Sequence, residues 1–180
     1  MATRLDIVNW ALFEANAWYG DTHWKPTSLE MIDIFTTAGL KAPSNGDLEK
    51  FKKASGNISI NGQSIAWCGI FTCYVLKKYG GLDVKWVSGK GIVGTGIDKT
   101  WSAKGMRPGD IAIVRETPES KGKAVHHHFV VTKVDYASNT MESVDGNSTN
   151  NEIVWHRNKK IYHAGKSGLD VYCHYKLKME

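Results

Sequence analysis

Cysteine is the residue type in this sequence with the most direct chemical potential, and Cys68 has the most suggestive position. It lies in the segment Ala66–Phe71, at the start of a predicted helix that follows a glycine-rich stretch. A free thiol has a pKa of about 8.5, and the partial positive charge of a helix N-terminus stabilises the thiolate. The free N–H groups there can also stabilise an oxyanion. Cys68 is therefore a candidate nucleophile, although free cysteines are more often core residues, as we expect for Cys73 and Cys173.

A nucleophilic thiol needs a base, and three adjacent histidines open a predicted strand over residues 128–134. Side chains alternate along a strand, so His126 and His128 share one face and His127 takes the other. His128 adjoins the apolar segment Phe129–Val131, which favours it as the imidazole that the sheet holds best. We therefore expect His128 to be the base and His127 to face away from Cys68. A metal-binding tract and a solvated turn are the alternatives, but no further ligands lie nearby at zinc spacing.

An imidazole base must be oriented by a partner on its far nitrogen. Asp145 and Asn147 follow a predicted strand in the segment Val144–Ser148, and either of them can supply that partner. Their spacing of two places both on one face if the strand extends that far. Asp-Gly-Asn is also ordinary turn composition, so the segment taken alone predicts a turn.

The predicted elements that must position these residues fall into a helical part and a strand part. Apolar spacing predicts helices over 3–19, 28–39, 48–53 and 67–79, with a loop over 55–64. The stretch 84–104 has several glycines and no clear period, so we expect irregular structure there. Strands are expected over 111–114, 128–134, 141–144, 153–155 and 171–177. Helices first and strands second predict an α+β fold, with N-terminal helices packed on a central antiparallel sheet.

Length and composition limit the classes of protein that the chain can belong to. Its 180 residues predict one domain, with a helical part over 1–60 and a catalytic core over 61–180. Its 42% hydrophobic and 23% charged residues are typical of a globular protein, and its net charge of +5 suits an anionic partner. No apolar run reaches the roughly 18–20 residues of a membrane span, and we see no signal peptide. Three cysteines form neither a disulfide framework nor a zinc pattern.

The order Cys, His, Asx resembles that of papain-like cysteine hydrolases, and in particular the CHAP and NlpC/P60 group of peptidoglycan amidases and endopeptidases. Four segments carry the resemblance, in order, across about residues 60–157. They are Trp67–Phe71, similar to the family's Trp-Cys-Ala-x-Phe; Arg107–Ile111, similar to Pro-Gly-Asp-Ile; His128–Val131, similar to His-Val-Gly-Ile; and Val144–Asn147, similar to Glu-Gly-Asn.

The resemblance implies a papain-like fold and a role for each matched residue. Cys68 is the implied nucleophile and His128 the implied base, while Asp145 and Asn147 stand where the family has its acid and its Asn. The oxyanion would be held by the backbone at Cys68, and Gln63 is a further candidate donor. Gly69 departs from the family's Ala, and Phe129-Val130 from its Val-Gly. Trp67 and Trp101 are candidates to line a substrate cleft, as are Trp86 and Trp155, and no metal or cofactor is implied.

The expected function is therefore hydrolysis of an amide bond in bacterial peptidoglycan, by a lysin or by a secreted antibacterial effector. Without a signal peptide, such an enzyme would be made in the cytoplasm and would reach the periplasm or cell wall through lysis or specialised secretion. An interbacterial toxin would also have a tightly bound immunity protein. Two alternatives remain open. One is a hydrolase of the same fold that acts on an intracellular protein or a small amide. The other is a non-catalytic basic module that binds nucleic acid, whereas the main hypothesis expects no nucleic-acid partner.

Overall fold

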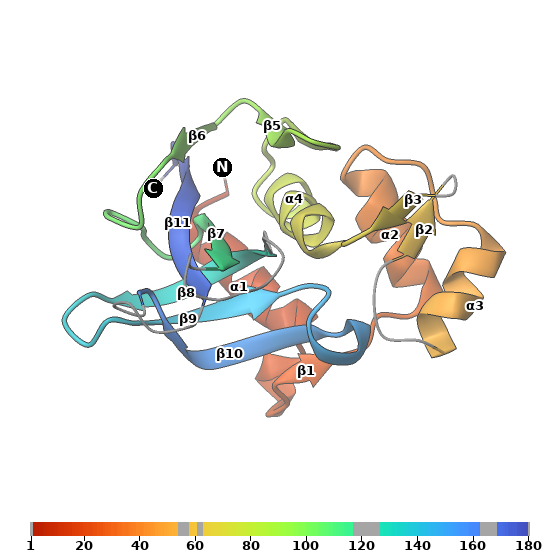
Figure 1. Cartoon of the computed structure of the whole chain (residues 1–180), viewed down its shortest axis with the longest axis horizontal. Helices are drawn as coiled ribbons and strands as arrows, with labels where there is room; N and C mark the ends of the chain where they lie inside the picture. Colours follow the sequence, from red (N-terminus) through yellow and green to blue (C-terminus); the bar gives the residue numbers. More distant parts are fainter. Residues whose placement is uncertain (1, 54–57, 61–62, 117–126, 163–168, 180) are drawn as a thin grey trace.

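The structure is a computed structural model, and it describes residues 2–53, 58–60, 63–116, 127–162 and 169–179. Within these ranges the chain forms four α-helices and one large antiparallel sheet (Figure 1). The α+β class expected from the sequence is confirmed.

The first two helices begin where the sequence provides a cap. Thr3 caps α1 (Arg4–Glu14) and Thr27 caps α2 (Ser28–Thr37), and in each case an acidic residue three positions on completes a capping box. The helix expected over 3–19 ends early, because Asn16 adopts a left-handed conformation with φ of 58°. A short 3₁₀ turn, η1 (Ala17–Tyr19), follows. The other two helices are α3 (Asn45–Lys53) and α4 (Cys68–Lys78).

The main sheet has seven strands in the order β1-β10-β9-β8-β7-β11-β6, and all of its pairings are antiparallel. Its strands are β1 (His23–Trp24), β6 (Ile97–Thr100), β7 (Ile111–Glu116), β8 (His127–Asp135), β9 (Thr140–Asp145), β10 (Ile153–Lys160) and β11 (Leu169–Leu177). A short 3₁₀ segment, η2 (Thr149–Asn151), precedes β10.

Two small hairpins lie outside the main sheet, and both correct the sequence analysis. The hairpin of β4 (Val84–Val87) and β5 (Gly91–Gly94), followed by the edge strand β6, occupies most of the stretch expected to be irregular. Its glycines at 89, 91 and 94 interrupt the alternation of apolar and polar residues, so the strands are hard to see in the sequence. All three have positive φ, which glycine adopts readily. The second hairpin, of β2 (Ile58–Ile60) and β3 (Gln63–Ile65), lies in the predicted loop.

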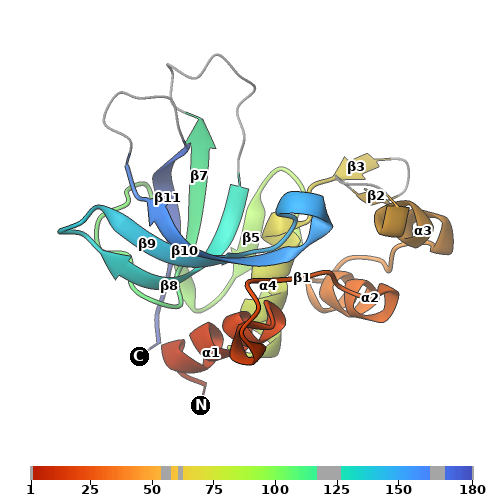
Figure 2. The ribbon, with the colours of Figure 1, turned by 90° about the horizontal axis from the view of Figure 1, so that it is seen from below.

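The main sheet separates two apolar clusters, and the helices cover only one of its faces. Val130 and Val144 belong to the larger cluster and lie on the face of the sheet that α1 and α4 contact. Phe129 and Val131 point to the opposite face, where a smaller cluster also contains Met106. Figures 1 and 2 show α1 and α4 on the same side of the sheet. This alternation along β8 and β9 decides which face each candidate site residue occupies.

A buried ion pair ties the first helix to the sheet. Arg4 Nη1 donates to Asp110 Oδ1 at 2.8 Å, and the other donors of the guanidinium reach the backbone oxygens of Leu177 (2.6 Å) and Met179 (2.9 Å). Asp110 also accepts from the backbone N–H groups of Arg107 and Leu177. The Pro-Gly-Asp segment therefore holds α1 and β11 together, rather than reaching the sulfur.

Candidate active site

Cys68 is the first residue of α4, and its backbone lies where the helix leaves N–H groups unpaired. The preceding residue, Trp67, makes no side-chain cap hydrogen bond, and the first helical bond runs from the Phe71 N–H to the Trp67 carbonyl oxygen. The first turn of α4 therefore presents free N–H donors and a positive partial charge next to the sulfur. The Cys68 residue itself is 4% exposed.

His127, the first residue of β8, joins Cys68 to a buried carboxylate. Its Nε2 donates to Asp145 Oδ2 at 2.8 Å, and its ring also hydrogen-bonds the Cys68 side chain. Asp145, the last residue of β9, is 1% exposed. The three side chains form a continuous series of thiol, imidazole and carboxylate, and such a series is able to activate a thiol.

The electrostatics of this series favour an ion pair of thiolate and imidazolium. Burial alone would raise the pKa of the Cys68 thiol, but hydrogen bonds to His127 and His128 outweigh it and lower the pKa to about 5. Burial alone would lower the pKa of His127, but its hydrogen bonds to Asp145 and Cys68 raise it to about 9. By contrast, burial raises the pKa of Cys73 to about 12, as expected for a core thiol.

Asp145 is held by donors from three different residues. Ser143 Oγ donates to its Oδ1 at 2.6 Å, and Lys159 Nζ shares its Oδ2 with His127. Burial would raise the pKa of Asp145, but the charge of Lys159 and the hydrogen bond from His127 hold it far below the usual carboxyl range. Asp145 is therefore ionised in the pH range in which His127 gains or loses its proton.

The assignment of the two histidines made from the sequence is wrong in one respect. His127, which was expected to face away from Cys68, contacts it and is the ring that Asp145 holds. His128 lies on the α4 face with Val130, its ring packs edge-on against Trp86, and its Nδ1 has no hydrogen-bond partner among the described residues. The alternation was correct, but Cys68 lies at a helix end beside the first residues of β8, where side chains from both faces can reach it.

Asn147 was the alternative orienting residue. It lies in the turn after β9 with φ of 54°, a conformation that Asn tolerates better than most residues. The carboxylate of Asp145 rather than the Asn147 amide bonds the far nitrogen of His127. Of the other sequence candidates, His126 and the side chain of Gln63 lie outside the described residues.

The tryptophans named as candidate cleft residues have different positions. Trp67 is fully buried and packs against Phe51 and Phe71, so it is a core residue and not a cleft residue. Trp101 directly follows β6 and is 70% exposed. Trp86 covers the site from the β4–β5 hairpin, where it contacts the His128 ring.

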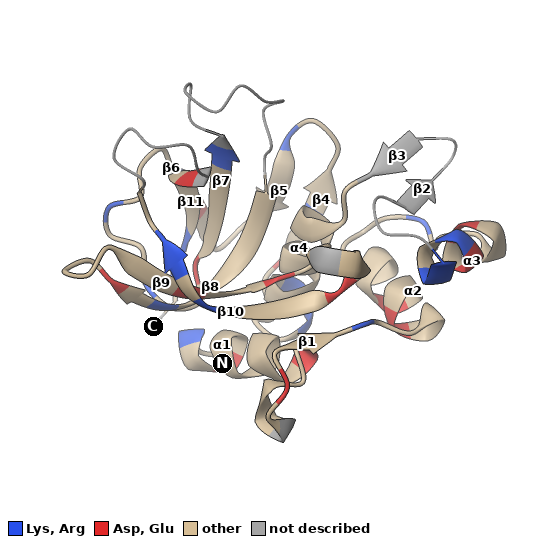
Figure 3. Cartoon of the chain, turned by 60° about the horizontal axis from the view of Figure 1, so that its bottom comes forward, with Lys and Arg blue, Asp and Glu red and all other residues tan. Residues whose placement is uncertain are grey.

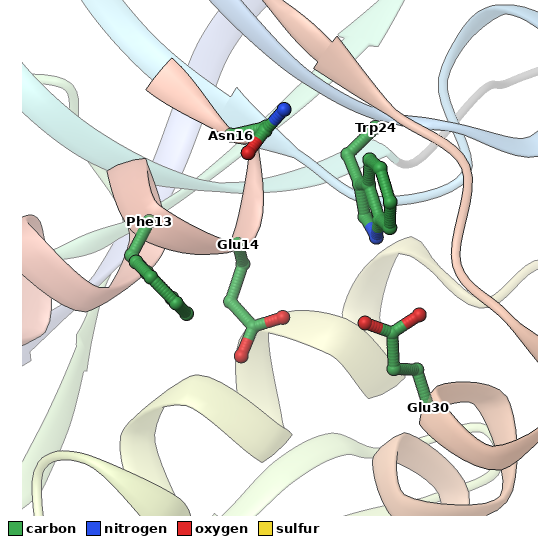
Figure 4. A pocket seen from close by; sticks show the side chains of 5 residues that line it. All are labelled: Phe13, Glu14, Asn16, Trp24 and Glu30. Carbon is green, nitrogen blue, oxygen red and sulfur yellow. The ribbon is translucent and has the colours of Figure 1, made fainter. Parts of the chain in front are cut away.

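A hollow of about 120 Å³ lies away from these residues, between α1 and the start of α2 (Figure 4). It is lined by Phe13, Glu14, Asn16, Trp24 and Glu30. Glu14 also accepts hydrogen bonds from the hydroxyls of Tyr74 and Tyr79. Its carboxylate thus joins α1 to α4, which is a structural role.

No group of three or more metal-ligating side chains occurs within the described ranges. No helix in this part of the chain has the length and apolar character needed to cross a membrane. Comparisons with family models, with curated proteins and with solved structures found no match.

Proposed function

We propose that this protein is a cysteine hydrolase that cleaves an amide bond through a thioester intermediate. The observation that carries the proposal is the contact of Cys68 with His127, whose Nε2 lies 2.8 Å from Asp145 Oδ2. A structural cysteine has no need of an imidazole that a buried carboxylate orients. The lowered pKa of Cys68 and the raised pKa of His127 support the same conclusion.

In the first half of the reaction, the Cys68 thiolate attacks the amide carbonyl carbon. The N–H groups at the start of α4 stabilise the resulting oxyanion. His127, as imidazolium, gives its proton to the leaving nitrogen, the carbon–nitrogen bond breaks, and an amine departs. The acyl group then remains on sulfur as a thioester, and His127 is neutral.

In the second half, water replaces the amine. Neutral His127 takes a proton from the water as its oxygen attacks the thioester carbonyl. The carbon–sulfur bond breaks, the acid is released, and the ion pair of thiolate and imidazolium is restored. Asp145 keeps the His127 ring in one pose throughout, while His128 supports the thiolate from the α4 face of the sheet, which is opposite to the face of His127.

We further propose a papain-like fold and peptidoglycan as the substrate. A helix that carries the cysteine and packs on an antiparallel sheet that carries the histidine and the acid supports the fold. The four motif segments and the net charge of +5 support an anionic wall polymer. The basic residues are spread over several elements, with one group on α3 that consists of Lys50, Lys52 and Lys53 (Figure 3).

The test is digestion of purified peptidoglycan sacculi, with mass spectrometry of the released fragments. We expect new amine and carboxyl ends at one type of amide bond, and no release by the Cys68→Ala variant. Release that persists in Cys68→Ala would contradict the mechanism. If the wall stays intact although Cys68 of the same protein is rapidly alkylated, the substrate is instead a different amide. Slow alkylation together with salt-dependent nucleic-acid binding would favour a binding module.

A further inference from the structure

A groove runs between the β4–β5 hairpin and the edge strand β6 of the main sheet. It has a volume of about 210 Å³, and its lining residues are Lys90, Ile92, Val93, Gly94, Ile97, Lys99 and Tyr175. Its wall includes the buried ring of Tyr175, whose hydroxyl accepts a hydrogen bond from the Ile92 N–H at 3.2 Å. That bond fixes the hairpin against β11.

Gly91, which stands in the sequence between the groove residues Lys90 and Ile92, lies close to the candidate active site. A Cβ placed on Gly91 would lie 2.6 Å from Tyr175 Oη and 4.0 Å from His128 Nε2. Gly91, the first residue of β5, therefore lies next to both the Tyr175 hydroxyl and the ring of His128. Because His128 also contacts the Cys68 thiol, a single imidazole ring lies between Gly91 and the sulfur.

The groove is also positively charged. No acidic residue lines it, and neither Lys90 nor Lys99 forms an ion pair within the described ranges. The ammonium of Lys99 lies over the rings of Trp101 (4.3 Å) and Tyr175 (5.5 Å), which hold it at the groove without neutralising it. The nearest acid in sequence, Asp98, pairs with Lys178 at 2.9 Å.

We propose that this groove binds the substrate on one side of the scissile amide, and that the substrate is a peptide with a free carboxylate close to that amide. The inference rests on the proposed function and deepens it. Lys90 and Lys99 bind the carboxylate of the substrate, and the apolar groove residues contact the rest of the bound peptide. The two lysines are substrate-binding residues and take no part in the chemical steps.

The first test compares alkylation of Cys68 by iodoacetate, which is anionic, with alkylation by iodoacetamide, which is neutral. Both reactions are followed by mass spectrometry at one pH and low ionic strength. We expect the iodoacetate-to-iodoacetamide rate ratio to fall by roughly threefold or more in Lys90→Ala/Lys99→Ala, in line with the energies of exposed charge pairs. Lys85→Ala, which removes an exposed lysine of β4 outside the groove, serves as the matched control and should leave the ratio unchanged.

The second test uses sacculi before and after their free carboxylates are converted to amides with carbodiimide and ammonia. The wild-type protein should cleave the amidated wall at least about fivefold more slowly, whereas Lys90→Ala/Lys99→Ala should cleave both walls at similar rates. Equal cleavage of both walls by the wild type would overturn the carboxylate inference and leave the hydrolase intact. No cleavage of either wall would count against peptidoglycan, and the alkylation ratio would still decide whether the groove selects anions. An unchanged ratio in the double variant, or a Cys68 that resists both reagents, would overturn the inference.

Discussion

At the residue scale, Cys68 and Asp145 could be identified from the sequence as candidate site residues, but His127 could not be identified as the imidazole that contacts both. Cys68 was identified from its place at a helix start, and Asp145 from its place at a strand end. The choice between His127 and His128 could not be made by alternation alone. Alternation assigns each ring to a face, but it does not show that α4 ends close enough for its first residue to meet both. Only the packing of α4 on β8 contains that information.

The first prediction compares the two histidines. His127→Ala should lower kcat by about 10²–10⁴-fold, because it removes the proton donor and acceptor of both half-reactions. His128→Ala should cost less, because His128 supports the thiolate but is not oriented by Asp145. The rate at which each variant cleaves a soluble wall fragment measures both effects. Thermal unfolding checks that both variants are folded. If His128→Ala were the more severe loss, Asp145 would not mark the base.

The second prediction concerns pH. Alkylation of Cys68 by iodoacetamide should gain rate as pH rises through about 5, where the thiol ionises, while kcat/KM should fall above about 9, where His127 loses its proton. Asp145→Asn removes the carboxylate that raises the pKa of His127, so the alkaline limb of kcat/KM should move to lower pH. Ser148→Ala, near His156 rather than His127, is the control. An alkaline limb that stays in place in Asp145→Asn would separate it from the His127 titration.

At the element scale, the helices and most strands of the main sheet followed from capping and apolar spacing, whereas the β4–β5 hairpin did not. Its glycines remove the alternation on which strand prediction depends, and its value lies in tertiary contacts. Trp86 of β4 packs directly on Gly69 of α4 and on the ring of His128. The family resemblance presents Gly69 as a mild departure from Ala, but here the glycine makes room for an indole.

The third prediction tests that contact. A Cβ at Gly69 would lie 2.2 Å from two atoms of the Trp86 ring, so Gly69→Ala must displace the hairpin or the indole. We expect a loss of about 1–3 kcal/mol in the free energy of unfolding, as for other overpacked sites, and a lower kcat as His128 loses its support. Denaturant unfolding measures the first effect. Gly46→Ala in α3, where the nearest atom would be 3.9 Å away, should be close to neutral. Equal effects of the two substitutions would argue against the contact.

At the scale of the whole molecule, the helices and the sheet share one core. The larger apolar cluster contains residues from all four helices and from several strands of the main sheet. One domain over residues 1–180 stays a prediction that rests on the length of the chain. The long-range bond between Arg4 and Asp110 could not be predicted, because no local pattern pairs residues so far apart.

The fourth prediction concerns this ion pair. Arg4→Met leaves Asp110 charged and buried, so it should cost about 3–5 kcal/mol in the free energy of unfolding. Because the pair lies away from Cys68, kcat should be unchanged at temperatures where the variant is folded. Calorimetry should give one transition for both proteins if the chain is a single cooperative unit. Lys178→Met, which breaks the exposed pair with Asp98, should cost less than about 1 kcal/mol.

The guanidinium of Arg4 also fixes where the two ends of the chain emerge. Its bonds to Leu177 and Met179 hold the first helix against the last strand, and Figures 1 and 2 show both termini on one side of the molecule. Ile7 of α1 packs at the Gly80 end of α4, a full helix length from the sulfur. A carrier domain or a solid support attached at either terminus would thus leave the Cys68 end of α4 exposed to the solution. A polymer as large as a cell wall could then still reach it.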